Sequence, residues 1–325
     1  MRCQPLRRAL VLHYRGTMKI SESLHHLKKT FANVNNWEDD SFCYDKAFVC
    51  GVMSQLAYCH VSDYELENTD HVNLIPSSTF ARIIAGDKTV TLNSIMNELN
   101  IEAPVIIEST ASVTVAIEYN DVVFISMRGT ENANDWRKNF KCKKIKPTRY
   151  VPFSHNVELH KGFYFEVLSS IDLLFDELEK RKWNNKTIYI TGHSLGGALA
   201  AITFALREYQ FFRLGLPFRR NEHPKITSCY TFGMPRWGND AAIEFFRNPY
   251  HLFVSNDLVP SIPLKIMGYE DCLHQYSLDE QSFIYVDFSL SKLEKVKESA
   301  IAFVTKKKKV DHLIENYVER IHLRK

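Results

Sequence analysis

The stretch TIYITGHSLGGALAAITFALRE, residues 187–208, is the most informative part of this chain. Its first five residues are rich in β-branched and aromatic side chains and predict a short strand, and the Ala- and Leu-rich run from Leu195 predicts a helix. The junction holds a G-x-S-x-G motif, in which a sharp turn presents the hydroxyl of Ser194 as a nucleophile at the carboxyl edge of a sheet. Gly192 and Gly196 suit that turn because a Cβ at either position would collide with the crossing chain. The alternative interpretation is a Gly-rich loop that only opens a helix.

Strand-like and helical patterns alternate along the rest of the chain. This alternation predicts βαβ units, and therefore an α/β fold with a mostly parallel central sheet and helices on both faces. Strands are expected at 104–108, 112–119, 121–127, 187–191, 226–232 and 251–255, with a hairpin at 273–287. Helices are expected at 45–59, 89–99, 163–182, 195–208, 239–247, 290–304 and 311–321.

The composition indicates a globular protein with one large core. The chain has 325 residues, of which 45% are hydrophobic and 24% are charged, and its 12 Gly and 11 Pro leave little material for long linkers. We therefore expect a single domain over residues 45–325, preceded by a poorly defined N-terminal extension over 1–44. The seven cysteines are scattered and include no C-x-x-C pair, so neither a zinc ribbon nor a dense disulfide framework is expected.

Charge and hydropathy limit the partners and the location. The net charge of +3 is too small to indicate a nucleic-acid partner. No apolar run reaches the length of a transmembrane helix, and the apolar stretch 9–12 is too short for a secretory signal peptide. We therefore expect a cytoplasmic location or a peripheral position at a membrane. Neither a metal nor an organic cofactor is predicted, because the sequence shows no metal-ligand spacing and no G-x-G-x-x-G fingerprint.

A nucleophilic serine needs a base, and the base needs an acid that orients it. In folds with this turn the chain order is Ser, then Asp or Glu, then His. Asp257 directly follows a predicted strand, at the end where open α/β sheets place their sites. A turn or cap aspartate is the alternative for Asp257, and Asp240 and Asp271 are weaker candidates for the acid. His312, at the start of the last predicted helix, is the preferred base, and His274 is the alternative.

Backbone N–H groups are the expected donors to a developing oxyanion. The first is that of Leu195, directly after the serine. The second is expected after the strand 121–127, where Gly129 permits a tight turn and Thr130 offers an N–H and a hydroxyl. An ordinary strand-ending turn is the alternative there.

Together these segments resemble the class 3 lipase family of α/β-hydrolases. The resemblance follows the family's order over roughly residues 45–320. The matching motifs are VFISMRGT (123–130), DW (135–136), HKGF (160–163), GHSLGG (192–197), TFGMPRWGN (231–239), NDLVP (256–260), and His312 with Tyr317.

The resemblance implies an α/β-hydrolase fold and a serine carboxylester hydrolase that acts on lipid esters, as a triacylglycerol lipase or a phospholipase A1-like enzyme. It implies Ser194 as the nucleophile, Asp257 as the orienting acid and His312 as the base. Thr130 and Leu195 carry over as the oxyanion donors. A catalytically silent α/β-hydrolase that serves as a binding module and an acyltransferase with the same three residues are the alternatives.

The resemblance also implies a lid over the site near residues 131–152, with Trp136 on it. The chain after Trp136 is strongly basic and includes Lys143 and Lys144. We expect this segment to contact an anionic membrane surface, where basic side chains contribute about 1 kcal/mol each; a solvated basic loop is the alternative. The basic lid favours phospholipids over neutral triacylglycerols as substrates. Trp237 replaces the small aliphatic residue usual in the family, so we expect a reshaped pocket.

Overall fold

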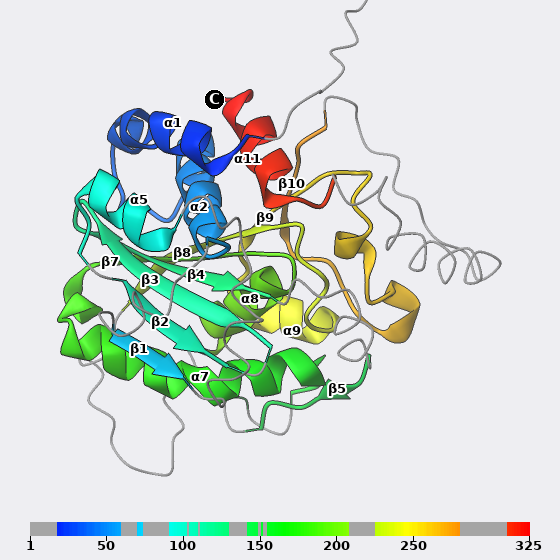
Figure 1. The fold of residues 1–325 in the computed structure, drawn as a ribbon. Coiled ribbons are helices and arrows are strands. Elements are labelled where there is room, and N and C mark those ends of the chain that lie inside the picture. The colour runs from blue at the N-terminus through cyan, green and yellow to red at the C-terminus, as the bar shows by residue number, and fades with distance from the viewer. Residues whose placement is uncertain are drawn as a thin grey trace, which may run out of the picture.

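An eight-stranded sheet forms the centre of the fold (Figure 1). The computed structural model describes residues 18–59, 70–73, 91–102, 104–109, 111–129, 142–148, 151, 155–207, 225–279 and 311–325. The strands, in their order across the sheet, are β1 (Asp70–Asn73), β2 (Val105–Glu108), β3 (Val113–Tyr119), β4 (Val122–Arg128), β7 (Thr187–His193), β8 (Ile226–Phe232), β9 (Tyr250–Phe253) and β10 (His274–Ser277). The β2–β3 and β3–β4 pairs are antiparallel and the other neighbouring pairs are parallel, so the predicted mostly parallel sheet is confirmed.

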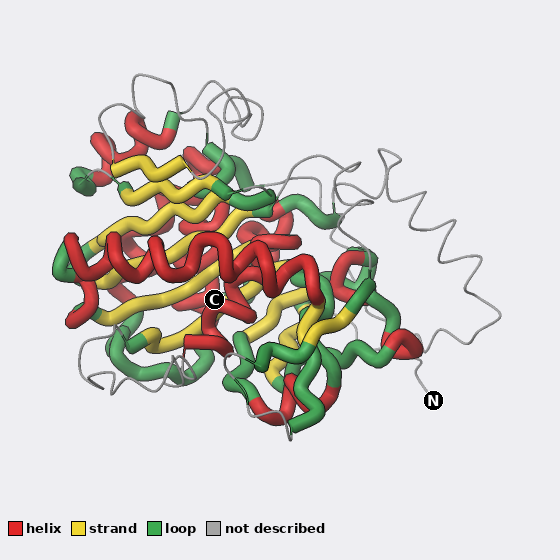
Figure 2. Tube along the Cα trace, turned by 90° about the horizontal axis from the view of Figure 1, so that it is seen from below, coloured by secondary structure: helices red, strands yellow, loops and turns green. Residues whose placement is uncertain are grey.

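Helices cover both faces of this sheet (Figures 1 and 2). One face is packed against α1 (Ile20–Asn33), α2 (Tyr44–Leu56), α5 (Leu92–Leu99) and α11 (Ile314–His322). The opposite face is packed against α7 (Lys161–Lys180), α8 (Leu195–Arg207) and α9 (Asp240–Phe245). In Figure 2, seen from the side of this second layer, a long helix crosses the strands. Short 3-10 turns follow at η1 (Trp183–Asn185), η3 (Val259–Ser261) and η4 (Lys265–Met267).

The strand that leads to Ser194 is buried on both sides. Ile188 and Ile190 of β7 face the core under α7 and α8, whereas Tyr189 between them faces the core under α2. The hydroxyl of Tyr189 donates to the carbonyl of Trp37 at 2.9 Å, so this buried polar group is paired. Alternation of faces along the strand therefore fixes its position between the two helix layers.

The structure adds a helix that the sequence analysis did not assign. Residues 1–44 were expected to be a poorly defined extension, but α1 packs on α2 and buries Leu24, Leu27 and Phe31. The ring of Phe31 stacks on Trp37, with the centroids 4.5 Å apart. These three residues lie on one face at helical spacing, but the polar residues around them conceal the pattern. The division of the chain into an extension and a domain stays a prediction.

The C-terminal part of the sheet differs in detail from the expected hairpin. β10 pairs in parallel with β9, and the remainder of the hairpin predicted over 273–287 lies outside the described residues, as does the helix predicted over 290–304. Trp237 is completely buried in the core beside α8 and α9, where its indole N–H donates to Cys272 Sγ at 3.2 Å. The described helices include none with the length and apolar character needed to cross a bilayer.

Candidate active site

Ser194 stands in the turn between β7 and α8, with a left-handed φ of 60°. Its N–H donates to the carbonyl of Phe232 on β8 at 2.9 Å, which ties the turn to the sheet. A Cβ at Gly192 would overlap the carbonyl group of Gly196, and a Cβ at Gly196 would overlap the carbonyl group of Met127 on β4. The predicted collision is confirmed. The two glycines let neighbouring backbone segments pack closely around the turn, and this packing holds Ser194 in a conformation that is unusual for a non-glycine residue.

Three side chains from distant parts of the chain form a line of hydrogen bonds. Ser194 Oγ lies 2.7 Å from His312 Nε2, and His312 Nδ1 lies 2.7 Å from Asp257 Oδ2. A carboxylate can only accept, so Nδ1 carries the proton and Nε2 accepts from the hydroxyl of Ser194. Ser194 and Asp257 are buried, whereas the His312 side chain keeps 13% of its surface exposed. The arrangement suits a serine nucleophile, a base that receives its proton and an acid that fixes the base.

Two further donors fix the carboxylate of Asp257. The hydroxyl of Tyr317 on α11 donates to Oδ2 at 2.6 Å, and the N–H of Val259 donates to Oδ1 at 2.9 Å. Burial, followed by the charge of Asp257, raises the pKa of Tyr317 well above its ordinary value, so the phenol stays protonated. Gly233 leaves room for this pair: its φ is 54°, and a Cβ there would lie 2.8 Å from both Asp257 Oδ2 and Tyr317 Oη.

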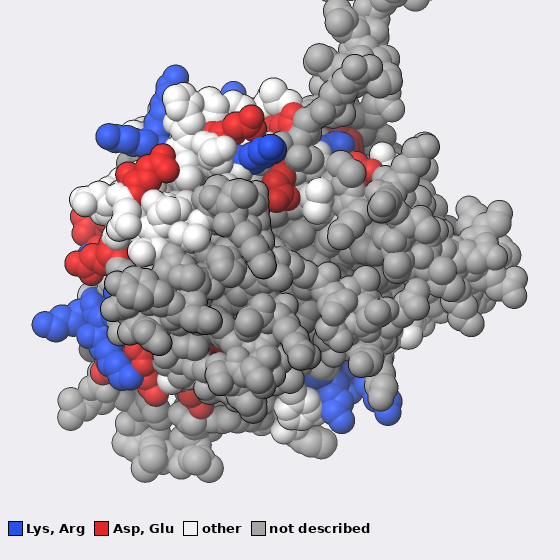
Figure 3. Space-filling model, in the orientation of Figure 1, with Lys and Arg blue, Asp and Glu red and all other residues white. Residues whose placement is uncertain are grey.

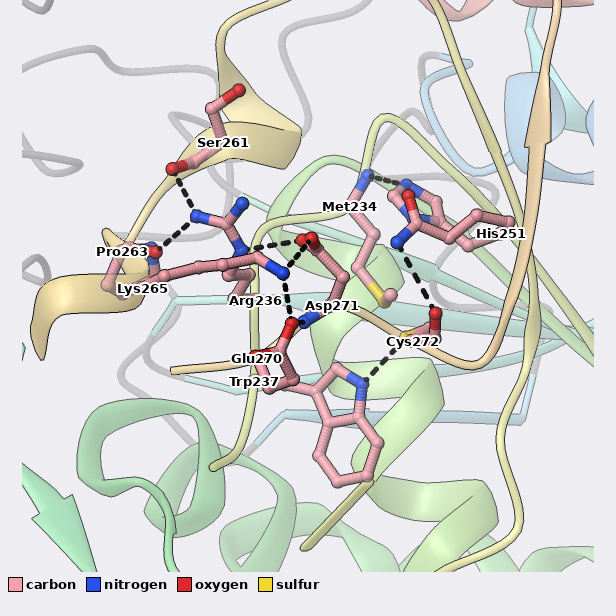
Figure 4. Close-up of polar contacts among 11 residues, drawn as sticks. Met234, Arg236, Trp237, His251, Ser261, Pro263, Lys265, Glu270, Asp271 and Cys272 are labelled. Atoms are coloured by element: carbon pink, nitrogen blue, oxygen red, sulfur yellow. Dashed lines mark hydrogen bonds and ion pairs between the residues drawn. The ribbon is translucent and has the colours of Figure 1, made fainter. Parts of the chain in front are cut away.

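The loop that follows Asp257 is held by Arg236 (Figure 4). The guanidinium donates to the carbonyl groups of Ser261 at 2.6 Å and Pro263 at 2.9 Å, and its Nε donates to Asp271 Oδ1 at 2.6 Å. Burial acts to raise the pKa of Asp271, but the hydrogen bonds and charges of Arg236 and Lys265 together outweigh it and lower the pKa. Asp271, a weaker candidate for the acid, therefore belongs to ion pairs with Arg236 and Lys265, whereas Asp257 is the carboxylate that bonds His312.

The first turn of α8 faces the end of β4. Because α8 begins at Leu195, the helix itself offers no acceptor for the N–H of that residue. Gly129, just after β4, lies against Leu195: a Cβ on Gly129 would be 2.5 Å from Leu195 Cβ. Thr130, the second predicted oxyanion donor, lies outside the described residues, so its role stays a prediction.

The other candidate acid and base lie apart from this constellation. His274 is exposed at the first residue of β10, and the strands β8, β9 and β10 are parallel, so it sits at the opposite edge of the sheet from Ser194. Asp240 opens α9, and its carboxylate accepts from the N–H of Ala241 at 2.8 Å, as expected at a helix start.

The basic segment is described only in part. Trp136 and the first residues of the predicted lid lie outside the described residues. Lys143 is exposed, whereas Lys144 belongs to β5 (Lys144–Ile145), which pairs with β6 (Leu159–His160) on the body of the fold. The Lys144 ammonium lies 3.0 Å from a carboxylate oxygen of Glu158 and donates to the carbonyl of Gly268 at 3.1 Å. Figure 3 shows basic side chains where Figure 1 places β5.

Comparison with known proteins gives a family match over part of the chain. Residues 124–267 match the family Lipase (class 3). Over these residues the chain is similar to the class 3 lipases. The matched segment contains Ser194 and Asp257 and ends before His312. The resemblance to this family that the motifs indicated is thus confirmed.

Curated relatives of this segment include fungal and bacterial proteins. Identity is 28% over 164 residues to Secreted mono- and diacylglycerol lipase 1 from Fusarium solani, covering 48% of this chain and 44% of that protein. It is 29% over 182 residues to Lipase from Rhizomucor miehei, covering 53% and 46%. It is 36% over 107 residues to Toxin TseL from Vibrio cholerae, covering 32% and 15%. The chain thus spans less than half the length of these relatives.

Solved structures share the fold of this chain. The mono- and diacylglycerol lipase from Aspergillus oryzae aligns with a TM-score of 0.51 and 16% identity, covering 75% of this chain and 82% of that chain. A mutant form of MDLA from Penicillium cyclopium aligns with a TM-score of 0.51 and 17% identity, covering 77% and 86%. At these identities the likeness concerns the fold, and the predicted α/β-hydrolase fold is confirmed.

Proposed function

We propose that this protein is a serine carboxylester hydrolase acting on lipid esters, with Ser194 as nucleophile, His312 as base and Asp257 as orienting acid. The observation that carries the proposal is the continuous hydrogen-bonded line from Ser194 Oγ to Asp257 Oδ2, with 2.7 Å at each step. The class 3 lipase match supports the class of reaction, and lipid ester substrates are inferred from the names of the relatives.

The proposed cycle has two halves with one base. Ser194 Oγ attacks the ester carbonyl while its proton passes to His312 Nε2, and the collapse of the tetrahedral intermediate sends that proton out with the alcohol. Water then attacks the acyl-enzyme, gives a proton to the same Nε2, and releases the acid as Ser194 recovers its hydrogen. In both halves the oxyanion accepts hydrogen bonds from the N–H of Leu195 and from a group of Thr130. The support for this pair of donors is that Gly129, the residue before Thr130, lies directly against Leu195.

Ester hydrolysis with graded p-nitrophenyl esters tests this proposal. Ser194→Ala should lower kcat/KM by about 10⁴-fold or more, because it removes the nucleophile. Ser169→Ala is the matched control, since this serine is exposed on α7 and donates to the carbonyl of Glu166 within its own helix. Equal activity of Ser194→Ala and wild type would overturn the proposal. An inactive wild type would favour the binding-module alternative, and ester formation with an added alcohol would favour an acyltransferase.

We also propose that the basic segment contacts an anionic lipid surface through Lys143, with Lys144 and Trp136 nearby in the sequence. The support is an apolar turn beside it: Ile266 and Met267 of η4 are 60% and 44% exposed. Two contacts join the turn and the segment. The hydroxyl of Tyr269 donates to the carbonyl of Lys143 at 3.4 Å, and the Lys144 ammonium donates to the carbonyl of Gly268. Basic and apolar groups side by side are typical of interfacial contacts.

Sedimentation with vesicles tests this lipid contact. Phosphatidylserine-containing vesicles should bind the protein more tightly than phosphatidylcholine alone at low salt, and Lys143→Glu and Ile266→Ser should each weaken that binding. Lys143 is chosen over Lys144 because Lys144 already pairs with Glu158. Leu323→Ser is the control, since Leu323 is also 61% exposed but follows α11. Unchanged binding in both test variants would refute the contact.

A further inference from the structure

His193, the residue before the nucleophile, makes two side-chain hydrogen bonds inside the fold. Its Nε2 lies 2.6 Å from the main-chain carbonyl oxygen of His312, and its Nδ1 lies 3.0 Å from the hydroxyl of Tyr58. The side chain is buried, with a residue exposure of 5%, and its ring lies 4.7 Å from that of His312, centroid to centroid. Tyr58 follows α2, so this contact joins three separate parts of the chain.

The chemistry of the partners fixes the state of this imidazole. A carbonyl oxygen can only accept, so Nε2 of His193 carries a hydrogen and donates it to His312. Nδ1 is then the acceptor for the hydroxyl of Tyr58, and a neutral ring satisfies both contacts. Burial, followed by the charge of His312, lowers the pKa of His193 well below its ordinary value, which agrees with a neutral ring.

The carbonyl that His193 holds lies just outside the helix. The hydrogen-bond ladder of α11 begins with the carbonyl of Leu313, which accepts from the N–H of Tyr317 at 3.4 Å. His312 lies one residue earlier, so the helix does not hold its carbonyl. His193, adjacent to Ser194, thus binds the main chain of His312. The hydroxyl of Ser194 binds the imidazole ring of the same His312 at 2.7 Å.

The geometry points to His193 as a positioning residue that holds the main chain of His312 at the distance from Ser194 that proton transfer requires, with Tyr58 selecting its tautomer. This inference rests on the proposed function. The guanidinium of Arg128 lies over the Tyr58 ring, 5.1 Å from its centre, and this second contact helps to hold the orientation of Tyr58. A loss of the carbonyl contact would free His312 to shift, and displacement by about 1 Å costs on the order of 100-fold in rate.

Three variants separate positioning from general packing. His193→Phe keeps a ring but removes both hydrogen bonds, His193→Gln keeps an N–H donor near the Nε2 position, and Tyr58→Phe removes only the hydroxyl. His274→Phe is the matched control, because His274 is exposed at the far edge of the sheet. The measurements are kcat and KM with a p-nitrophenyl ester, the labelling rate of Ser194 by a fluorophosphonate, and the thermal melting temperature.

We expect kcat and the labelling rate to fall in parallel while KM stays within about twofold. The fall should be about 100-fold for His193→Phe and about tenfold for both His193→Gln and Tyr58→Phe. The melting temperature of Tyr58→Phe should stay close to that of wild type, which separates positioning from a loss of folding. The control should match wild type in every measurement.

Nitrogen NMR gives a readout that does not depend on activity. In ¹⁵N-histidine-labelled protein, His193, identified by its absence from the His193→Gln spectrum, should show the neutral Nε2–H tautomer, and Tyr58→Phe should change its Nδ1 signal. Full activity in His193→Phe and Tyr58→Phe, or a protonated Nδ1 on His193, would overturn the inference. A wild type that neither hydrolyses esters nor reacts with the fluorophosphonate would overturn the proposed function instead, while the tautomer would still test the contact.

Discussion

Replacing Gly233 by Ala tests how closely the fold is fitted around Asp257. The new Cβ would lie 2.8 Å from both Asp257 Oδ2 and Tyr317 Oη, closer than a carbon and an oxygen can pack. These two oxygens are themselves 2.6 Å apart in a hydrogen bond, so the Cβ crowds both partners of that bond at once and their side chains have to shift to admit it. Asp257 must then move, and His312 with it.

The magnitude follows from two separate costs. A non-glycine residue at a φ of 54° costs about 1 kcal/mol. Loss of a hydrogen bond to a buried carboxylate adds about 1.5 to 3 kcal/mol. We therefore expect Gly233→Ala to lower the free energy of unfolding by about 3 kcal/mol, and to lower kcat/KM about 100-fold through the displaced base.

Gly268→Ala is the matched control for backbone strain. Gly268 has a φ of 76°, and among the described residues a Cβ there would meet only the end of the flexible Lys144 side chain, at 2.6 Å. Urea unfolding and ester hydrolysis should show a loss of about 1 kcal/mol and nearly unchanged kcat/KM for this control. If Gly233→Ala retains kcat/KM within twofold of Gly268→Ala, the reasoning about the fit around Asp257 is refuted.

Two further predictions concern pH and stability. Glu108 is completely buried, and burial raises its pKa from 4.5 to about 7, so the free energy of unfolding should fall as the pH rises through that interval. Urea unfolding should show Glu108→Gln removing a decline on the order of 3 kcal/mol, with exposed Glu98→Gln as control. An unchanged pH slope would contradict this. Burial lowers the pKa of His160 and His251 to about 4, so each should cost stability as the pH falls from 6.5 towards 4. His160→Asn, which keeps a cap for α7, should flatten that acid-side loss, and an equally steep loss would argue against it.

The sequence was most informative where the structure depends on neighbours along the chain. The strand, the turn at Ser194 and the helix from Leu195 follow from local patterns and from the need for two close-packed glycines. The strand predicted at 226–232 has the bounds of β8. The family match covers residues 124–267 and therefore includes this strand, the turn and the helix.

The contacts that shape the site depend on residues far apart in the chain, and the sequence analysis missed most of them. Tyr317 was noted as part of a motif, but its bond to Asp257 spans 60 residues. The bond between His193 and His312 spans 119 residues, and no local pattern predicts it. Arg236 likewise reaches the loop after Asp257 only because the sheet places β8 beside β9.

The order of the site residues along the chain has a consequence for synthesis. His312 follows Asp257 by 55 residues and Ser194 by 118, so a growing chain carries the serine and the acid long before it carries the base. The same late segment supplies Tyr317, Val318 and Ile321, which share a core with Phe48 and Val52 of α2. A chain released before this point lacks the base and exposes the apolar surface that α11 covers, so incomplete copies would be inert towards esters and prone to aggregate.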